Sequence, residues 1–201
     1  NPQEDSLAFS CLCELDKQGN ITDYKFAKTV IRSRVKGVYS EINSLLAGSD
    51  DAELKEKYAE VSGQLPIIKE LADILYTNKK NRGCPELETS ESKLIINDED
   101  ICVGVERRTR GRSEEIIEDF MLVANECAAR FGMDNNLPFV YRIHEEPSDE
   151  KLESLREALV KLNVQYKLGE KACPGDMSEI LKAEKGTDID LVMNNIVMRS
   201  M

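Results

Sequence analysis

The chain has 201 residues, 41% of them hydrophobic, so it is long enough to bury a core and is expected to be globular. It carries 38 acidic against 27 basic residues, a formal net charge of −11. This charge argues against a generally basic nucleic-acid surface and leaves only local basic patches for RNA. The sequence has no run of about 20 apolar residues and no secretory leader pattern. We therefore expect a cytoplasmic protein without a membrane span.

Cysteine and histidine usage limits the metal chemistry that the chain could perform. The cysteines are Cys11, Cys13, Cys84, Cys102, Cys127 and Cys173. Structural zinc sites need paired ligands, and the chain has no C-x-x-C pair and a single histidine, His144. For His144 we expect a structural or surface role. Cys11 and Cys13 would share one face of a strand, and Cys127 would lie on the apolar side of a helix. We predict reduced, mostly buried thiols and no metal ligand.

The first elements form a long predicted hairpin. Residues 7–15 alternate in polarity, "DKQGN" supplies turn residues, and residues 21–36 continue as a second strand. By the period of two, Arg32 and Arg34 share one strand face with Lys28 and Lys36. This face could line a path for phosphates, or it could be solvated and pair with acidic residues of the chain.

Helical spacing follows over residues 38–46 and 50–80, where Pro66 breaks or kinks the second helix or starts a new one. A second hairpin is predicted from residues 93–97 and 101–108, joined by the acidic turn "DED". It ends in "RRTRGR", directly before a helix N-terminus, a position that favours anions. The candidate phosphate contacts there are Arg108, Arg110 and Arg112, although a solvated loop would have the same sequence.

Residues 113–132 predict a helix whose apolar belt is wider than a simple amphipathic stripe, which indicates burial on more than one side. Its remaining face carries Glu115, Asp119, Leu122 and Glu126 at spacings of four, three and four. Such an acidic stripe is either solvated or faces a ligand.

The last third alternates short strands and helices. We predict strands over 139–144 and 164–168, a helix over 148–162 with Ser148 as its N-cap, and a helix over 175–186. Thr187 and Asp190 fit a capping box for a final helix. With no repeat or clear linker, the sequence predicts one mixed α+β unit of largely antiparallel strands and several packed helices. The final "MNNIVMRSM" is an apolar helical pattern without a C-cap glycine, so we expect a piece of a longer protein.

Six stretches, in order across nearly the whole chain, resemble the catalytic RNB domain of the ribonuclease II and ribonuclease R family, with a style closest to bacterial ribonuclease R. These stretches are "NPQEDSLAFSCLCELDKQG", "KTVIRSRVKGVYSEIN", "RGCPELE", "EEIIEDFMLVANECAA", "PFVYRIHEEPSDEKLESL" and "IVMRSM". The resemblance implies processive 3′-to-5′ hydrolysis of single-stranded RNA to nucleoside 5′-monophosphates, with Mg²⁺ held by aspartates. In the family those aspartates precede the "NPQED" stretch, and an arginine-bearing motif follows the "RSM" stretch. We therefore assign no catalytic residue and no bound metal to residues 1–201.

The resemblance implies three RNA contacts near the 3′-terminal nucleotides. Tyr39 matches the tyrosine of a Y-x-x-[I/V]-N stretch, where its ring would stack on a base or its hydroxyl would meet a nucleotide. Asp119 matches an acidic position before M-x-x-A-N and could accept hydrogen bonds from a base edge or a 2′-hydroxyl. Leu87 matches a position after R-G that is often aromatic. The alternative is a half-buried ring for Tyr39 and a solvated carboxylate for Asp119.

A rival hypothesis is a non-catalytic binding or interaction module that holds a protein partner through exposed apolar surface. A third is a structural subunit that completes its active site with another chain. Under the family hypothesis the partners are single-stranded RNA and the remainder of the same polypeptide. Salt separates the first two hypotheses, because RNA binding weakens steeply as salt rises and an apolar protein contact does not.

Overall fold

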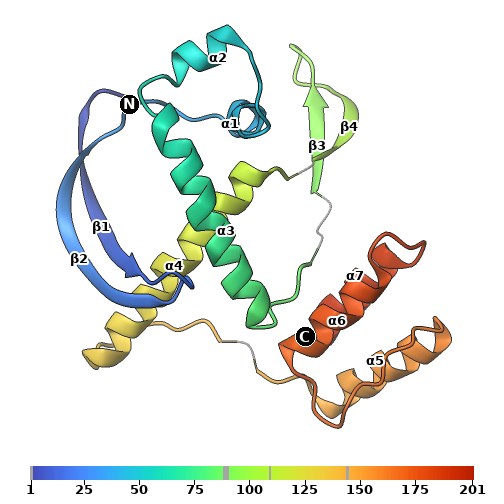
Figure 1. Cartoon of the computed structure of the whole chain (residues 1–201). Coiled ribbons are helices and arrows are strands. Elements are labelled where there is room, and N and C mark those ends of the chain that lie inside the picture. The colour runs from blue at the N-terminus through green and yellow to red at the C-terminus, as the bar shows by residue number, and fades with distance from the viewer. Residues whose placement is uncertain (1, 88–90, 109, 144) are drawn as a thin grey trace. The chain divides into compact units, whose positions relative to one another are not determined.

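A computed structural model describes residues 2–87, 91–108, 110–143 and 145–201, without the side chains of Glu91, Arg107 and Arg108. His144 and the side chain of Arg108 therefore lie outside the described part. The chain forms two compact units: Asn1–Asn78 with Thr109–Tyr141, and Lys79–Arg108 with Arg142–Met201 (Figure 1). Because the two units interleave along the sequence, the division does not mark two successive domains.

The first unit opens with the predicted hairpin, β1 (Asp5–Leu15) and β2 (Ile21–Arg32), paired antiparallel with Cys11 opposite Phe26. Its turn is held by Asp16, whose carboxylate accepts hydrogen bonds from the backbone N–H groups of residues 18 and 20, both at 2.8 Å. The hairpin is thus confirmed, but β2 ends at Arg32. The prediction that the second strand continues to residue 36 is wrong, and Arg34 lies outside β2.

The helices of this unit are α1 (Tyr39–Leu46), α2 (Ala52–Lys57), α3 (Leu65–Asn81) and α4 (Arg112–Asp134), with a 3₁₀ turn at Ser62–Gln64. Pro66 is the second residue of α3, so it starts a new helix rather than kinking an existing one. Proline is tolerated in the first turn because the N–H that it lacks has no partner within the helix there. The predicted helix over 113–132 is confirmed as α4.

Helix α4 packs on the hairpin, which curves beside it in Figure 1. Phe131 of α4 meets the ring of Phe26 edge to face at 5.4 Å between centroids, and Ile116 and Cys127 are buried. Ile117 and Met121, which belong to the same predicted apolar belt, are exposed. The expected burial on more than one side is therefore not present in this chain by itself.

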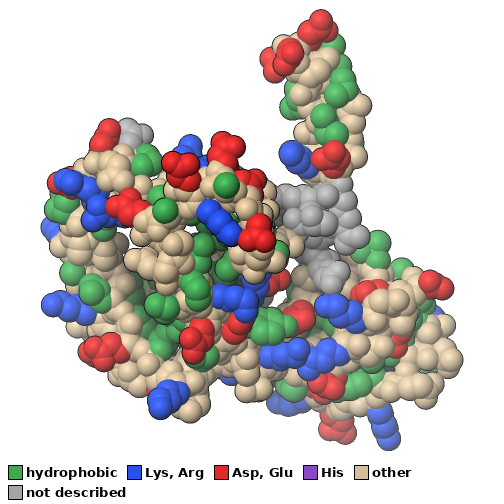
Figure 2. All heavy atoms as spheres, turned by 45° about the horizontal axis from the view of Figure 1, so that its top comes forward, with side chains coloured by type: hydrophobic (Ala, Val, Ile, Leu, Met, Phe, Trp, Pro, Cys, Tyr) green, Lys and Arg blue, Asp and Glu red, His purple; other side chains and the backbone are tan. Residues whose placement is uncertain are grey.

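The second unit contains the other predicted hairpin, β3 (Glu91–Ile96) and β4 (Cys102–Arg108), paired antiparallel with Leu94 opposite Val105. Asn97 holds its turn, accepting at Oδ1 from the N–H groups of residues 99 and 101. Figure 2 shows hydrophobic side chains along this hairpin and acidic side chains at its tip. Leu94 and Val105 are both exposed, so the hairpin leaves apolar surface in solvent.

The core of the second unit lies between α5 (Asp149–Lys161), α6 (Pro174–Glu184) and α7 (Asp190–Ser200). Its buried side chains are Leu152, Leu155, Leu159, Val164, Leu168, Met177, Ile180, Leu181, Met193 and Val197. Ser148 caps α5 by accepting from the N–H of Lys151, as predicted. The predicted capping box of α7 is wrong: Asp190 is the first helical residue, and its carboxylate accepts from the Gly186 N–H and the Asn194 amide.

The strands predicted over 139–144 and 164–168 are also wrong for the described residues, which form no strand there. In the second segment the alternation has another cause. Val164 and Leu168 insert into the helical core, and Tyr166 between them packs against it. Apolar residues at every second position therefore indicate only a segment that lies on a core; they do not require a neighbouring strand. The predicted α+β class is confirmed, since the described strands form two antiparallel hairpins among packed helices.

Among the described helices, none combines the length and the apolar character needed to cross a lipid bilayer.

We expect Leu155→Ala to destabilise the second unit, because Leu155 is 0% exposed and its truncation leaves a cavity among three helices. Such substitutions cost about 2–5 kcal/mol. The matched control is Val160→Ala on the same helix, where the side chain is 80% exposed and its loss should cost less than about 0.5 kcal/mol. Urea unfolding measures both, and equal losses in the two variants would contradict the assigned core.

Alkaline pH should weaken the second unit through Tyr166. Its hydroxyl donates to Asp176 at 2.8 Å, and this bond, with burial, raises the pKa of Tyr166 from 10 to about 12. Because the unfolded tyrosine loses its proton first, this stabilisation is complete below pH 10 and is lost as pH rises from about 10 to about 12. Tyr166→Phe should unfold with a shallower pH dependence in that window, measured as urea midpoints across it, and an unchanged slope would contradict the role of this hydrogen bond.

Candidate nucleic-acid interface

Tyr39, the first residue of α1, has a ring that is 45% exposed on a well-anchored backbone. The N–H of Val38 donates to the hydroxyl of buried Tyr58 at 3.1 Å, and that hydroxyl donates to Glu41 at 2.5 Å. Lys57 also donates to Glu41, at 2.6 Å. The hydrogen bonds from Lys57 and Tyr58 lower the pKa of Glu41, so its carboxylate stays charged at neutral pH. The end of α2 thereby fixes the start of α1.

A second set of hydrogen bonds ties α1 to the start of α4. Asn43 accepts at Oδ1 from the N–H of Ser113, at 2.8 Å, and donates from Nδ2 to Glu114, at 3.0 Å. Ser113 Oγ donates to the backbone carbonyl of Tyr39 at 3.0 Å. Although partial burial opposes the change, hydrogen bonds from Asn43 and Ser113 lower the pKa of Glu114. The backbone of Tyr39 is thus linked directly to the N-terminus of α4.

Gly111 is required by this junction for its size. A Cβ atom at this position would lie 2.0 Å from Nδ2 of Asn43, far inside van der Waals contact. Its N–H donates to Glu114 at 3.1 Å, which closes the first turn of α4. Any side chain at this glycine would displace the Asn43 amide and disturb its hydrogen bonds to Ser113 and Glu114.

The arginines around Gly111 border an open hollow of about 580 Å³, whose wall also includes Ser40, Asn43 and Lys69. Arg112 donates to Asp73 at 2.7 Å and to Glu115 at 3.0 Å, and its guanidinium lies 5.7 Å from the centre of the Tyr76 ring. Although partial burial opposes the change, Glu115 and Asp73 raise the pKa of Arg112. The wall is therefore cationic but already partly neutralised.

The other cations of this wall are paired in the same way. Arg110 forms an ion pair with Glu118, and Lys69 forms one with Asp73 at 2.8 Å. The structure thus brings Arg110 and Arg112 to one hollow, and Ser113 holds the backbone of Tyr39 at the same N-terminus of α4. The side chain of the third predicted arginine, Arg108, lies outside the described part.

Arg32 and Arg34 are half-exposed and also carry acidic partners. Arg32 pairs with Asp5 at 2.7 Å, and Arg34 pairs with Glu60 at 3.4 Å. Exposed ion pairs contribute about 0–1 kcal/mol each, so neither pairing prevents a phosphate from taking the place of the carboxylate. Because β2 ends at Arg32, the two arginines do not share one strand face as the sequence predicted.

Asp119 lies in the middle of α4 and is only 3% exposed, whereas Glu115, one turn earlier, is exposed. The acidic stripe is therefore not a uniformly solvated face. Leu87, in the second unit, packs against the helical core of that unit rather than standing in solvent. Contacts of Asp119 and Leu87 with RNA stay predictions, and the described conformation offers little of the Asp119 surface to a ligand.

Three residues that hold this junction together were not predicted as site residues from the sequence: Asn43, Gly111 and Glu114. Asn43 stands in the quoted "YSEIN" stretch, but hydrogen bonds to a helix 70 residues later leave no local pattern. Gly111 and Glu114 did leave a partial signal, since glycine is favoured at an N-cap and a glutamate three positions later can accept from the N-cap N–H.

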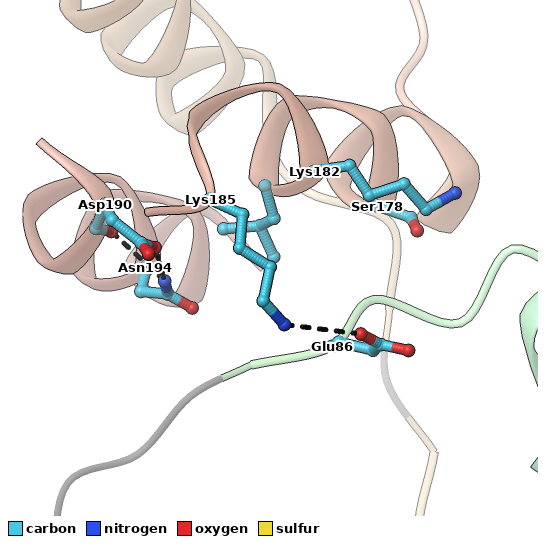
Figure 3. Close-up of a pocket in the computed structure, with 7 residues that line it drawn as sticks. Glu86, Ser178, Lys182, Lys185, Asp190 and Asn194 are labelled. Carbon is cyan, nitrogen blue, oxygen red and sulfur yellow. Dashed lines mark hydrogen bonds and ion pairs between the residues drawn. The ribbon is translucent and has the colours of Figure 1, made fainter. Parts of the chain in front are cut away.

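The second unit has a smaller hollow beside α6 and α7, with room of about 20 Å³, which is on the scale of one water molecule. Figure 3 shows Lys185 of this hollow reaching across to Glu86, at 3.9 Å. The hollow is too small for a nucleotide.

The described residues offer no metal site. In the described ranges, no three histidine, cysteine, aspartate or glutamate side chains gather in a way that could hold a metal ion. These residues do not fit the Mg²⁺ that the family resemblance implies for a longer protein.

Proteins named ribonuclease R are similar to this chain over its whole length. A ribonuclease R 1 of Lactococcus lactis is 32% identical over 206 residues, which cover 100% of this chain and 24% of that protein. Ribonuclease R of Escherichia coli is 31% identical over 201 residues, again covering 100% and 24%. The chain therefore spans about a quarter of the length of these curated relatives.

Solved structures share the fold. The apo form of Mycoplasma genitalium RNase R superimposes with a TM-score of 0.90 at 23% identity, covering 100% of this chain and 31% of that one. The same enzyme in complex with ribose-methylated single-stranded RNA gives 0.89 at 24% identity, with the same coverage. The model of the RNB domain family matches residues 1–201. The chain belongs to the RNB domain family.

Proposed function

We propose that this chain is part of a 3′-to-5′ exoribonuclease of the ribonuclease R type, which degrades single-stranded RNA processively to nucleoside 5′-monophosphates. The proposal is supported by relatives named ribonuclease R, at 31–32% identity over the whole chain. Structures of the same fold hold single-stranded and double-stranded RNA. Because the chain spans about a quarter of its relatives, the activity belongs to the longer protein. We place that protein in the cytoplasm.

Within that enzyme, residues 1–201 supply RNA contacts and channel wall, while the Mg²⁺ ligands and the catalytic groups lie elsewhere in the polypeptide. The observation that carries this assignment is the junction of α1 and α4. At this junction Ser113 holds the backbone of Tyr39, whose side chain is exposed. Arg110 and Arg112, at the same N-terminus of α4, border the open hollow. An aromatic ring stacks on any base, and guanidinium groups contact phosphates, so this pairing suits sequence-independent binding.

The ion pairs of the wall define how RNA would bind. A phosphate that approaches Arg110 replaces Glu118 as its partner, and the released carboxylate returns to water. Since an exposed ion pair contributes little, the exchange costs little, and each neutralised phosphate also releases counterions. Binding of RNA should therefore be sensitive to salt despite the net negative charge of the chain.

The second candidate function, a non-catalytic interaction module, is favoured by the exposed apolar side chains of the β3–β4 hairpin, including Leu94 and Val105. Such a surface would bind a protein and would tolerate salt. RNA binding that falls linearly on a double-logarithmic salt plot would exclude it as the sole function.

The first test compares degradation of a 5′-labelled single-stranded RNA, with Mg²⁺, by residues 1–201 and by a version extended on both sides along its gene. We expect stepwise shortening from the 3′ end by the extended protein alone, because two-metal hydrolysis needs clustered carboxylates. If neither protein acts, the exoribonuclease proposal fails. If the short chain acts, our assignment of catalysis to other residues is wrong.

The contribution of Tyr39 is tested by Tyr39→Ala in the extended protein, measured as affinity for a short single-stranded RNA at fixed salt. Stacking on an aromatic ring is worth about 1–3 kcal/mol per base, so affinity should fall about five- to 150-fold. Tyr141→Ala is the matched control, since its ring is similarly exposed in the same unit but lies outside the α1–α4 junction. Equal loss in both variants would remove Tyr39 from the interface.

A further inference from the structure

Three cysteine side chains of the first unit converge between β1 and α4. The sulfur of Cys127 donates to that of Cys13 at 3.7 Å, and Cys127 also shares a hydrogen bond with Cys11. All three are free thiols, with Cys127 fully buried and Cys11 and Cys13 partly exposed. We call Cys11, Cys13 and Cys127 the thiol cluster. It lies apart from the Tyr39 junction and has no role in the proposed function.

The hairpin and α4 produce this convergence by simple geometry. Residues two apart on a strand point to the same face, so Cys11 and Cys13 both face the side on which α4 packs. One turn after Cys127, Phe131 packs on Phe26, which is opposite Cys11 in the hairpin. The ring contact and the thiol contact therefore hold the same two elements together.

We propose that the thiol cluster is a covalent modification site, in which exchange with a small-molecule disulfide of the glutathione type joins Cys13 to Cys127. The bond would tie β1 to α4, residues that are 114 positions apart in the sequence.

The reaction is a two-step exchange. The Cys13 thiolate attacks one sulfur of the small disulfide, which forms a mixed disulfide and releases one thiolate of the reagent. The Cys127 thiolate then attacks the Cys13 sulfur, which forms the protein disulfide and releases the second thiolate. The two cysteine protons go to the two released thiolates, and the small disulfide is the oxidant, reduced to two thiols.

Geometry selects the pair. Cys11 and Cys13 are two strand residues apart, about 6.6 Å, whereas bridged cysteines need Cβ atoms about 3.8 Å apart. Cys127 is thus the shared partner, and Cys13, partly exposed, admits the reagent. Burial raises the pKa of Cys13, the hydrogen bond from Cys127 and the charge of Arg130 oppose this, and Cys11 and Asp23 add to it, so that the net direction is upward. The exchange should therefore be slow at neutral pH and faster in alkali, as the thiolate fraction grows.

The test uses the 201-residue chain with Cys84→Ser, Cys102→Ser and Cys173→Ser, which leaves the thiol cluster as the sole source of thiols. After treatment with oxidised glutathione, we expect a mass lower by two hydrogens, a peptide map joining Cys13 to Cys127, and a higher urea midpoint that dithiothreitol reverses. The control is the same oxidation of the chain unfolded in denaturant. If pairing depends on folding, the unfolded chain should form disulfides among the three cysteines without preference for Cys13 and Cys127.

Two variants in this background decide the pairing. Cys127→Ala keeps a small apolar side chain in the buried position and should yield mixed disulfides only, whereas Cys11→Ser should still form the Cys13–Cys127 bond. Circular dichroism verifies that each variant is folded. If a variant does not fold, the pairing is decided from the peptide map of the oxidised parent alone. A map showing Cys11 joined to Cys127, or only mixed disulfides in the folded parent, would overturn the proposal.

Discussion

The first unit depends on one constraint, the seating of α4 against two elements that come much earlier in the chain. At its N-terminus, Asn43 satisfies both the N–H of Ser113 and the carboxylate of Glu114, so partly buried polar groups are paired and not left to water. An unpaired group in such a place would cost about 1–3 kcal/mol, which makes the arrangement specific as well as stable. Towards its other end, Phe131 and Cys127 pack on the hairpin. The position of Tyr39 follows from these contacts.

Electrostatics limits how an acidic chain could contact RNA. The candidate arginines whose side chains are described are paired within the fold, as Arg32 with Asp5 and Arg34 with Glu60 show, so they create no broad positive field. Under the proposed function, a nucleotide would gain little from long-range attraction and would depend on local exchange of partners, with Tyr39 supplying a contact that carries no charge. Stacking and exchange together would favour short-range, sequence-tolerant binding, which suits the proposed degradation of varied RNA.

The sequence was a good guide wherever structure is set by neighbouring residues. Alternation and turn residues identified both hairpins, and Ser148 announced the start of α5. It was a poor guide where distant contacts decide. Val164 and Leu168 alternate because they enter a helical core, and Asp119 is buried although carboxylates mostly stay in water. The pairing of Arg112 with Asp73, 39 positions earlier, could not be read from local patterns either.

Helix α4 also relates the two sites that the first unit carries. Ser113 and Cys127 are fourteen residues apart on one continuous helix, a separation of about 21 Å at the standard rise. A bond at Cys127 therefore touches no group of the Tyr39 junction. It would instead restrain the sliding and tilting of α4 on the hairpin. Because Ser113 and Glu114 hold α1 through direct hydrogen bonds, that restraint would reach the backbone of Tyr39. One continuous helix would thus connect the proposed bond to the candidate interface.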